Sequence, residues 1–155
     1  MKKKVTFSIR RKIINNIRLA NKKDIKSLHK LFNSSKHLLE DENDEYSIGD
    51  IKDYIGNKLK IAFVYELDGK VAGSVLAELH SYSIFICVLV VNQEYQNQGI
   101  GKKFLTHIED YAKKRNIENI EMFVESNNKN MKNFVNKNKY VQGKKFIYCA
   151  KKIKK

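Results

Sequence analysis

Apolar and polar positions divide the chain into short segments, and the clearest of these covers residues 84–112. Ile84 to Val91 is apolar, rich in β-branched residues and too short to span a membrane, which predicts a strand buried on both faces. A polar loop containing two glycines follows at 96–101. Apolar residues then recur at helical spacing and predict an amphipathic helix; they are Ile100, Phe104, Leu105, Ile108, Tyr111 and Ala112.

The loop at 96–101 predicts an anion site, most naturally one for phosphate. It lies where a strand gives way to a helix, and the first N–H groups of a helix have no partners within the helix itself. Gly99 and Gly101 have no Cβ, so a diphosphate could rest directly on the backbone there.

The same patterns predict the remaining elements. Strands are expected at 17–19, 61–67, 71–79, 117–124 and 146–150, with Asp68-Gly69 as a hairpin turn. Helices are expected after the N-caps Asn21, Ser47 and Asn127 or Asn128. The order β-α-α-β-β-β-α-β-α-β predicts an α/β (α+β) fold with a mixed sheet and helices on both faces. The strand–helix–strand unit around the loop favours a parallel pair.

Composition places these elements in one domain, residues 17–155, after a basic arm at 1–16 to which we assign no chemistry. The net charge of +14 permits nucleic-acid binding, but the lysines are scattered and arginine is scarce, so we expect a basic surface without a nucleic-acid partner. Cys87 and Cys149 have no metal-ligand spacing and are interpreted as reduced core residues of a cytoplasmic protein. We expect no membrane partner and no metal.

Two motifs, taken with the element order, resemble the GNAT superfamily of acyl-CoA-dependent N-acetyltransferases. The stretch from Leu89 to Lys102 is similar to the family's strand, pyrophosphate loop and helix start, with Gln96 where Arg or Gln is usual. The stretch from Asn128 to Tyr140 is similar to the family's Asn-x-x-Ala-x-x-Phe-Tyr-x-Lys-x-Gly-Phe. The resemblance covers residues 17 to about 153. It implies a largely antiparallel sheet with one splayed parallel strand pair.

The resemblance also implies acetyl-CoA as co-substrate and a primary amine, small or peptidic, as acceptor. Amides of Leu89 and Val91, with Val90 between them, would face the pantetheine arm, which Asn128 would also bind and against which Met131 and Phe134 would pack. The pyrophosphate would lie on the loop, with charge added by Lys102 and Lys103. The loop residues are Gln96, Asn97, Gln98, Gly99, Ile100, Gly101 and Lys102. Dimers are frequent in this family, so a homodimer is left open.

Catalytic residues are harder to assign, because Val135 occupies the position at which the family usually has a tyrosine that acts as the general acid. Tyr140, Tyr148 or water could protonate the leaving thiolate, or it could depart unaided. Alternatively, the domain binds acyl-CoA as a sensor or scaffold without turning it over. Glu78 is the best candidate for a general base if it is partly buried, although the alternation of its strand favours the solvent face more strongly. Glu125 is a further candidate.

The run Glu40 to Glu45 is the only acidic segment of a basic chain. In the GNAT fold, the segment that joins the first two helices often borders the acceptor site. An anionic rim there would attract a cationic amine such as a polyamine, an aminoglycoside or a lysine-bearing peptide. The alternative is a solvated loop that only balances charge.

Overall fold

The protein is represented by a computed structural model that describes residues 16–35, 45–151 and 153. The strands are β1 (Ile17–Leu19), β2 (Lys60–Leu67), β3 (Lys70–Leu79), β4 (Ser83–Val91) and β5 (Asn119–Met122). The helices are α1 (Ile25–Asn33), α2 (Ile48–Asp53), α3 (Ile100–Lys113) and α4 (Lys129–Lys137), with 3₁₀ turns η1 (Lys22–Asp24) and η3 (Gln93–Tyr95).

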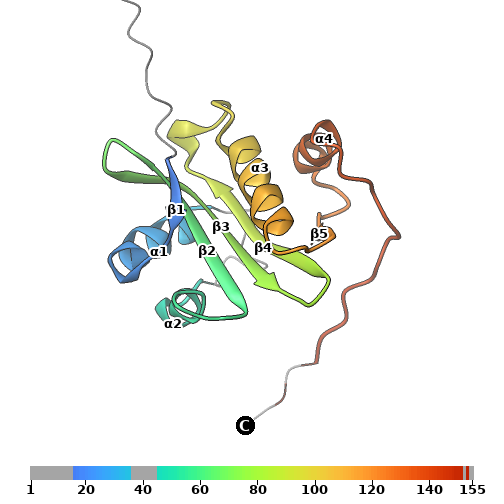
Figure 1. Ribbon diagram of the computed structural model, residues 1–155, viewed down its shortest axis with the longest axis horizontal. Coiled ribbons are helices and arrows are strands. Elements are labelled where there is room, and N and C mark those ends of the chain that lie inside the picture. The colour runs from blue at the N-terminus through green and yellow to red at the C-terminus, as the bar shows by residue number, and fades with distance from the viewer. Residues whose placement is uncertain (1–15, 36–44, 152, 154–155) are drawn as a thin grey trace, which may run out of the picture.

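In the described part of the chain, the strands form one five-stranded sheet in the order β1-β2-β3-β4-β5 (Figure 1). Neighbouring strands are antiparallel except β4 and β5, which are parallel and joined through α3. The predicted mixed, largely antiparallel sheet with one parallel pair is therefore confirmed.

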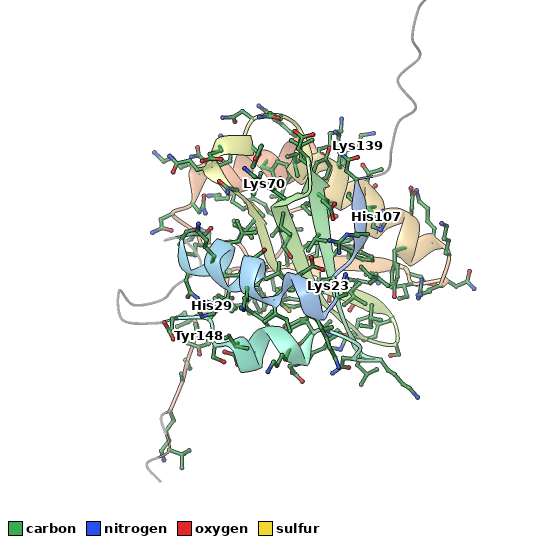
Figure 2. The ribbon with its side chains drawn as sticks, turned by 90° about the vertical axis from the view of Figure 1, so that its left-hand side faces the viewer. Lys23, His29, Lys70, His107, Lys139 and Tyr148 are labelled. Atoms are coloured by element: carbon green, nitrogen blue, oxygen red, sulfur yellow. The ribbon has the colours of Figure 1, made fainter. Side chains whose placement is uncertain are left out.

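Helices cover both faces of the sheet, and each face has its own hydrophobic core. Figure 2 shows α1 and α2 lying together in front of the strands, whereas α3 packs on the opposite face. Side chains alternate between the two cores along each strand. On β3, for example, Val75 and Ala77 join the core under α3, and Leu76 joins the core under α1 and α2.

Local signals in the sequence fold as predicted. Asn21 and Ser47 each cap a helical turn, and each belongs to a capping box with an aspartate three residues later. Asp68 and Gly69 have φ values of 49° and 74°, the left-handed conformations that a tight hairpin between β2 and β3 requires. Asn128 caps α4, as expected.

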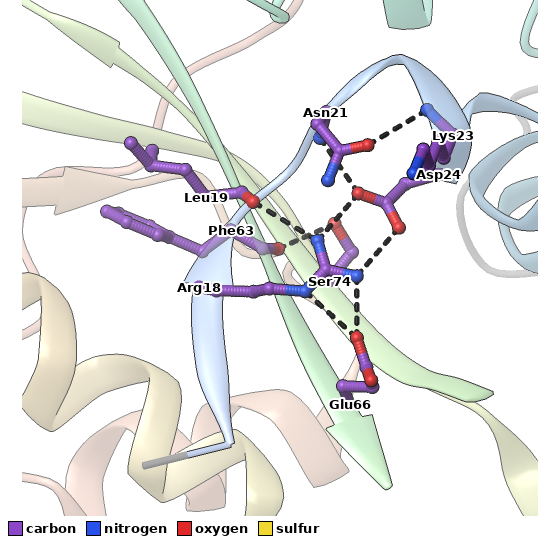
Figure 3. Close-up of polar contacts among 8 residues, drawn as sticks. All are labelled: Arg18, Leu19, Asn21, Lys23, Asp24, Phe63, Glu66 and Ser74. Atoms are coloured by element: carbon purple, nitrogen blue, oxygen red, sulfur yellow. Dashed lines mark hydrogen bonds and ion pairs between the residues drawn. The ribbon is translucent and has the colours of Figure 1, made fainter. Parts of the chain in front are cut away.

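An ion-pair network fixes the start of α1 to the edge of the sheet (Figure 3). The Arg18 guanidinium donates to both carboxylate oxygens of Asp24, at 2.8 and 2.9 Å, and to Glu66 at 2.6 Å. Asp24 is 5% exposed and also accepts the N–H of Asn21 at 2.8 Å. Hydrogen bonds from Arg18 outweigh burial and lower the pKa of the Asp24 carboxyl. Asp24 therefore stays ionised inside the fold.

The prediction of a strand at 146–150 is wrong. Residues 141–151 are extended, exposed and outside the sheet, so Cys149 is exposed and not a core residue. Cys87 is exposed as well, because β4 gains one extra residue there relative to β3. The strand expected at 117–124 is shorter, ending at Met122.

The basic arm predicted at 1–16 lies outside the described residues except for Asn16, and so does the acidic run except for Glu45. Among the helices that the structure describes, none is long and apolar enough to cross a membrane.

Candidate functional site

The site begins where β4 and β5 separate. The two strands pair only between Ser83–Ile86 and Asn119–Met122. On the other side of β4, the register with β3 shifts at the same level, since Leu76 faces Val88 and Ala77 faces Ile86. This bulge at Cys87 bends β4, as bulges do, and beyond it β4 stays with β3 and leaves β5. The result is an opening between the parallel strands.

The register with β3 decides which β4 amides face that opening. The N–H of Asn92 donates to the carbonyl of Ala72 at 2.9 Å. Because alternate residues of an antiparallel strand turn their N–H groups to opposite sides, Val90 is bonded to β3 whereas Leu89 and Val91 point away from it. The predicted amides of Leu89 and Val91 are therefore directed toward the gap left by β5.

The loop after β4 is held in a shape that exposes its backbone donors. The side-chain amide of Gln96 donates to the Val91 carbonyl at 3.0 Å and fastens the loop to the strand end. Asn97 and Gly99 are left-handed, with φ values of 59° and 77°. In the described part of the chain, no acceptor bonds the N–H groups from Asn97 to Lys102. Such a row of free donors at a helix N-terminus forms an anion-binding concavity.

The start of α4 forms the opposite wall. The Asn128 side-chain oxygen accepts the N–H of Met131 at 3.0 Å, which leaves the NH₂ of its carboxamide as a donor. Phe134 brings its ring against the start of α3, where a Cβ on Gly101 would lie 3.2 Å from Cζ of the ring. Gly101 therefore permits a close approach between α3 and α4.

Together these parts enclose a cavity of about 850 Å³. This is large enough for an elongated cofactor. All but two of the predicted cofactor residues line it: Leu89, Val91, Gln96, Asn97, Gly99, Ile100, Gly101, Lys102, Asn128, Met131 and Phe134. The two exceptions are Val90, which is buried in the core on the α1 face, and Gln98, which reaches back toward the Glu94 carbonyl.

Some lining residues were not predicted as cofactor ligands. They are Tyr95, Glu125, Asn127, Lys129 and Asn130. All but Tyr95 lie around the α4 start, so the capping signal at Asn127-Asn128 could have indicated them. Positive charge comes from Lys102 and Lys129. Lys103, expected to add charge, instead donates to the Tyr65 hydroxyl at 3.0 Å.

Comparison with known proteins assigns the chain to a protein family. The model of the acetyltransferase (GNAT) family matches residues 25–140, which is most of the chain. The chain belongs to the GNAT acetyltransferase family. The strands β4 and β5, which separate beyond Ile86 and Met122, correspond to the splayed parallel pair that the resemblance implied.

Solved structures share this GNAT fold at low sequence identity. An aminoglycoside acetyltransferase from an uncultured soil metagenomic sample, in complex with sisomicin, is 18% identical with a TM-score of 0.74, over 89% of this chain and 95% of that one. AAC(6')-Iy in complex with the bisubstrate analog CoA-S-monomethyl-acetylneamine is 15% identical with a TM-score of 0.75, over 88% and 97%. The ribosomal-protein-S18-alanine N-acetyltransferase from Escherichia coli is 16% identical with a TM-score of 0.68, over 78% and 74%.

Polar groups also gather beside the β4 bulge, on the face covered by α1 and α2. Glu78 is partly buried and lies 3.6 Å from the Lys60 ammonium, which also pairs with Asp53. Burial, followed by the neighbouring Cys87, raises the pKa of the Tyr54 hydroxyl. Cys87 is exposed overall, but the buried part of its side chain raises the pKa of the thiol. Both groups are therefore neutral near pH 7.

The candidates for a general acid lie elsewhere. Val135 is 4% exposed and belongs to the interior, whereas Tyr148 is exposed on the segment 141–151. The Tyr140 hydroxyl is buried and has no hydrogen-bond partner among the described residues, and Tyr140 does not belong to those that line the cavity. Burial, with a smaller effect of Glu109, raises its pKa to about 12. In the described residues, no cluster of His, Cys, Asp or Glu could hold a metal ion.

Proposed function

We propose that the protein transfers an acetyl group from acetyl-CoA to a primary amine of a small or peptidic, cationic acceptor. The observation that carries this proposal is the cavity between β4 and α4, in which the free N–H groups of the loop stand at one end and those of Leu89 and Val91 stand along one wall. Coenzyme A has the matching chemistry, since it carries a diphosphate at one end and an amide-bearing arm beyond it.

The chain supplies separate groups for each part of this co-substrate. The loop amides, at the positive end of the α3 dipole, would bind the diphosphate, and Lys102 and Lys129 would add charge. Leu89 and Val91 would pair with the pantetheine amides as a neighbouring strand does. The free NH₂ of Asn128 would donate to the same arm, while Met131 and Phe134 cover its apolar part.

Glu78 is the group we propose to receive the proton of the acceptor amine. It lies beside the bulge where β4 and β5 begin to separate, which is where the thioester would emerge from the gap. The neutral amine nitrogen forms a bond to the acetyl carbon, the carbon–sulfur bond breaks with its electron pair so that coenzyme A leaves as the thiolate, and the proton lost by nitrogen passes to the carboxylate. Asp53 and Glu78 also make this face attractive to a cationic amine. Juxtaposition of the two substrates would supply much of the rate.

A second candidate function is an acyl-CoA sensor that does not catalyse transfer. It is favoured by Val135, whose buried side chain cannot protonate a thiolate. This candidate shares the cofactor cavity with the first and differs only in turnover.

Two measurements test these functions in sequence. Acetyl-CoA at 100 times its Kd should stabilise the fold by about 2.7 kcal/mol, which raises Tm by roughly 5–10 °C. No shift with any acyl-CoA rejects both functions. Release of free CoA thiol is then measured against a panel of polyamines, aminoglycosides and lysine peptides. Binding without thiol release from any of them would identify the sensor.

Glu78→Gln tests the base once an acceptor is known. We expect kcat/KM to fall by about 10²–10⁴-fold. Glu118→Gln, which neutralises an exposed carboxylate before β5, is the matched control and should leave kcat/KM unchanged. Equal kinetics for the two variants would show that Glu78 takes no part in proton transfer.

A further inference from the structure

A separate pocket lies at the β1 edge of the sheet, whereas the cavity between β4 and α4 lies at the other edge. β1 ends at Leu19, and just beyond it the Ala20 N–H donates to the Ala62 carbonyl at 2.8 Å. β2 extends past this point, since its first residue is Lys60. This edge pocket lies where β1 leaves β2 open, and it has a volume of about 400 Å³, which is within the range of small-molecule sites.

Elements from both faces of the sheet contribute to the edge pocket. Tyr54 at the end of α2 comes from one face, and Tyr111 of α3 comes from the other. Ile61 and Ala62 of β2 also line the pocket and belong to the cores on opposite faces. The pocket therefore wraps around the edge of β2, and its aromatic and aliphatic side chains can cover the apolar part of a ligand.

β2 presents an open backbone donor to the edge pocket. The Ala62 carbonyl faces β1, because it accepts the Ala20 N–H. The Leu59 carbonyl faces β3, where it accepts the Leu79 N–H at 2.7 Å. Alternate residues of a strand turn their N–H groups to the same side, so the Lys60 N–H points away from β3, as that of Ala62 does. Among the described residues, β1 does not extend far enough to pair with Lys60. This open stretch of β2 is only about 7 Å long, which is too short for an added peptide strand and suits a small molecule.

The charged side chains of the edge pocket are cationic. Its lining includes Lys22, Lys58 and Lys60 and no carboxylate. The Lys60 ammonium is turned to Asp53 and Glu78, which offset its charge. In the described part of the chain, neither Lys22 nor Lys58 pairs with a carboxylate. Two uncompensated cations therefore stand beside the pocket, and a concave surface lined by one sign of charge attracts a ligand of the other sign.

Two carboxamides add neutral donors. The Asn21 side-chain oxygen accepts the Lys23 N–H at 2.9 Å (Figure 3), and the Asn57 side-chain oxygen accepts the Leu59 N–H at 2.8 Å. The NH₂ group is what remains of each carboxamide for another partner. Both asparagines line the pocket, so their NH₂ groups join the lysines and the Lys60 N–H as hydrogen-bond donors.

We propose that the edge pocket binds a small organic anion in which a phosphate or carboxylate group is attached to an apolar body. The ammonium groups of Lys22 and Lys58 and the backbone N–H of Lys60 would donate to the anionic group. The rings of Tyr54 and Tyr111 would cover the apolar body. This proposal is independent of acetyl transfer, because the edge pocket shares no lining residue with the cavity between β4 and α4.

Titration of phenyl phosphate and of benzoate into the isotope-labelled wild-type protein, followed by amide chemical shifts, tests the site without any substitution. The Lys60 amide signal should shift and saturate with at least one of the two anions, and the tighter of the two identifies the preferred anionic group. The readout is local, because a phosphate could also bind the loop amides after β4, whose signals are followed separately. The absence of a saturable shift at Lys60 with either anion would overturn the proposal.

Three further probes each carry only half of this chemistry. Benzyl alcohol has the apolar body without the charge, whereas inorganic phosphate and acetate have the charge without the body. Each should bind at least about tenfold more weakly than the better aromatic anion. Equal affinity for benzyl alcohol would show that the cations take no part in binding, and equal affinity for the inorganic phosphate or acetate would show that the apolar walls take none; either result would overturn the proposal.

A pair of double variants separates the edge pocket from the general charge of the protein. Lys22→Glu with Lys58→Glu should raise the Kd of the better anion at least about tenfold. Lys26→Glu with Lys52→Glu reverses the same number of charges at lysines of α1 and α2 outside the pocket and should leave this Kd unchanged. All four lysines are exposed, so both variants should keep the wild-type Tm. Equal Kd values in the two double variants would show that overall charge attracts the anion and would refute the site.

Discussion

The left-handed backbone at Gly99 allows a quantitative test of how the loop holds an anion. Gly99 has φ 77° and ψ 8°, and no described atom outside its immediate neighbours lies within 4 Å of the position that a Cβ would take. Gly99→Ala therefore introduces backbone strain and no clash. Left-handed strain for a residue with a Cβ is about 1–2 kcal/mol, which should lower Tm by roughly 2–8 °C.

Gly69 provides a matched control for this strain. It has φ 74°, equally open surroundings and a position in the β2–β3 hairpin rather than on the cavity. Gly69→Ala should cost the same 1–2 kcal/mol of stability. Any difference between the two variants in ligand binding is then due to location and not to stability.

Of the two variants, only Gly99→Ala should weaken the binding of CoA. To relieve its strain, the variant must rotate the peptides that present the N–H groups of Ile100 and Gly101. A hydrogen bond to a charged group contributes about 1.5–3 kcal/mol, so the loss of one raises Kd by roughly 10- to 150-fold. Calorimetric titration of CoA into both variants measures this. Equal Kd values for Gly99→Ala and the wild type would refute the account of the loop, and so would equal losses in the two variants.

Three further predictions concern single side chains. Asn128→Asp keeps the oxygen that caps α4 but removes the NH₂ donor. Tm should therefore stay unchanged, while the Kd for CoA, measured by calorimetry, should rise at least about tenfold. The control is Asn57→Asp, at another side chain whose oxygen accepts a backbone N–H, and it should leave this Kd unchanged. Asp24→Asn should cost about 2–3 kcal/mol, because it breaks a buried pair whose Arg18 is partly exposed and still bonded to Glu66. The Asp24 contribution is complete above the ordinary pKa of 3.8 and is lost as pH falls through its lower folded value. The difference in unfolding free energy between wild type and Asp24→Asn, measured by denaturant unfolding followed by circular dichroism, should therefore be constant above pH 3.8 and shrink below it; a difference that is the same at low pH would contradict this. Tyr140→Phe removes a hydroxyl that makes no hydrogen bond to any described residue, so Tm should not fall. A lowered kcat would assign this hydroxyl as the proton donor, whereas an unchanged kcat would exclude it.

Elements with a local cause were predictable from the sequence. The caps at Asn21, Ser47 and Asn128 and the hairpin at Asp68-Gly69 depend on residues only a few positions apart, and all of them form as expected. The strand at 146–150 failed because a strand needs a neighbouring edge as well as a pattern. Nothing local to Phe146 specifies which edge that is.

The candidate site also has one part that was predictable from the sequence and one part that was not. The loop could be located from its glycines, because Gly99 needs a left-handed backbone and Gly101 needs space beside Phe134. The directions of the side chains could not be predicted from the sequence. Lys102 and Lys103 are adjacent and chemically identical, yet Lys102 lines the cavity and Lys103 turns to Tyr65 on β2. That choice depends on which strand lies beside α3, and this information is absent from the motif.

Gln96 supports the proposal that the loop holds an anion without an arginine at that position. Its carboxamide bonds the Val91 carbonyl and so fixes the angle at which the loop leaves β4. The donors that face the cavity are backbone N–H groups, presented by the left-handed turns at Asn97 and Gly99. In the proposed anion site the Gln96 side chain therefore braces the backbone, the backbone would provide the hydrogen-bond donors, and Lys102 would add charge. A side-chain change that preserves the brace should leave the anion site intact, whereas a change in backbone geometry should not.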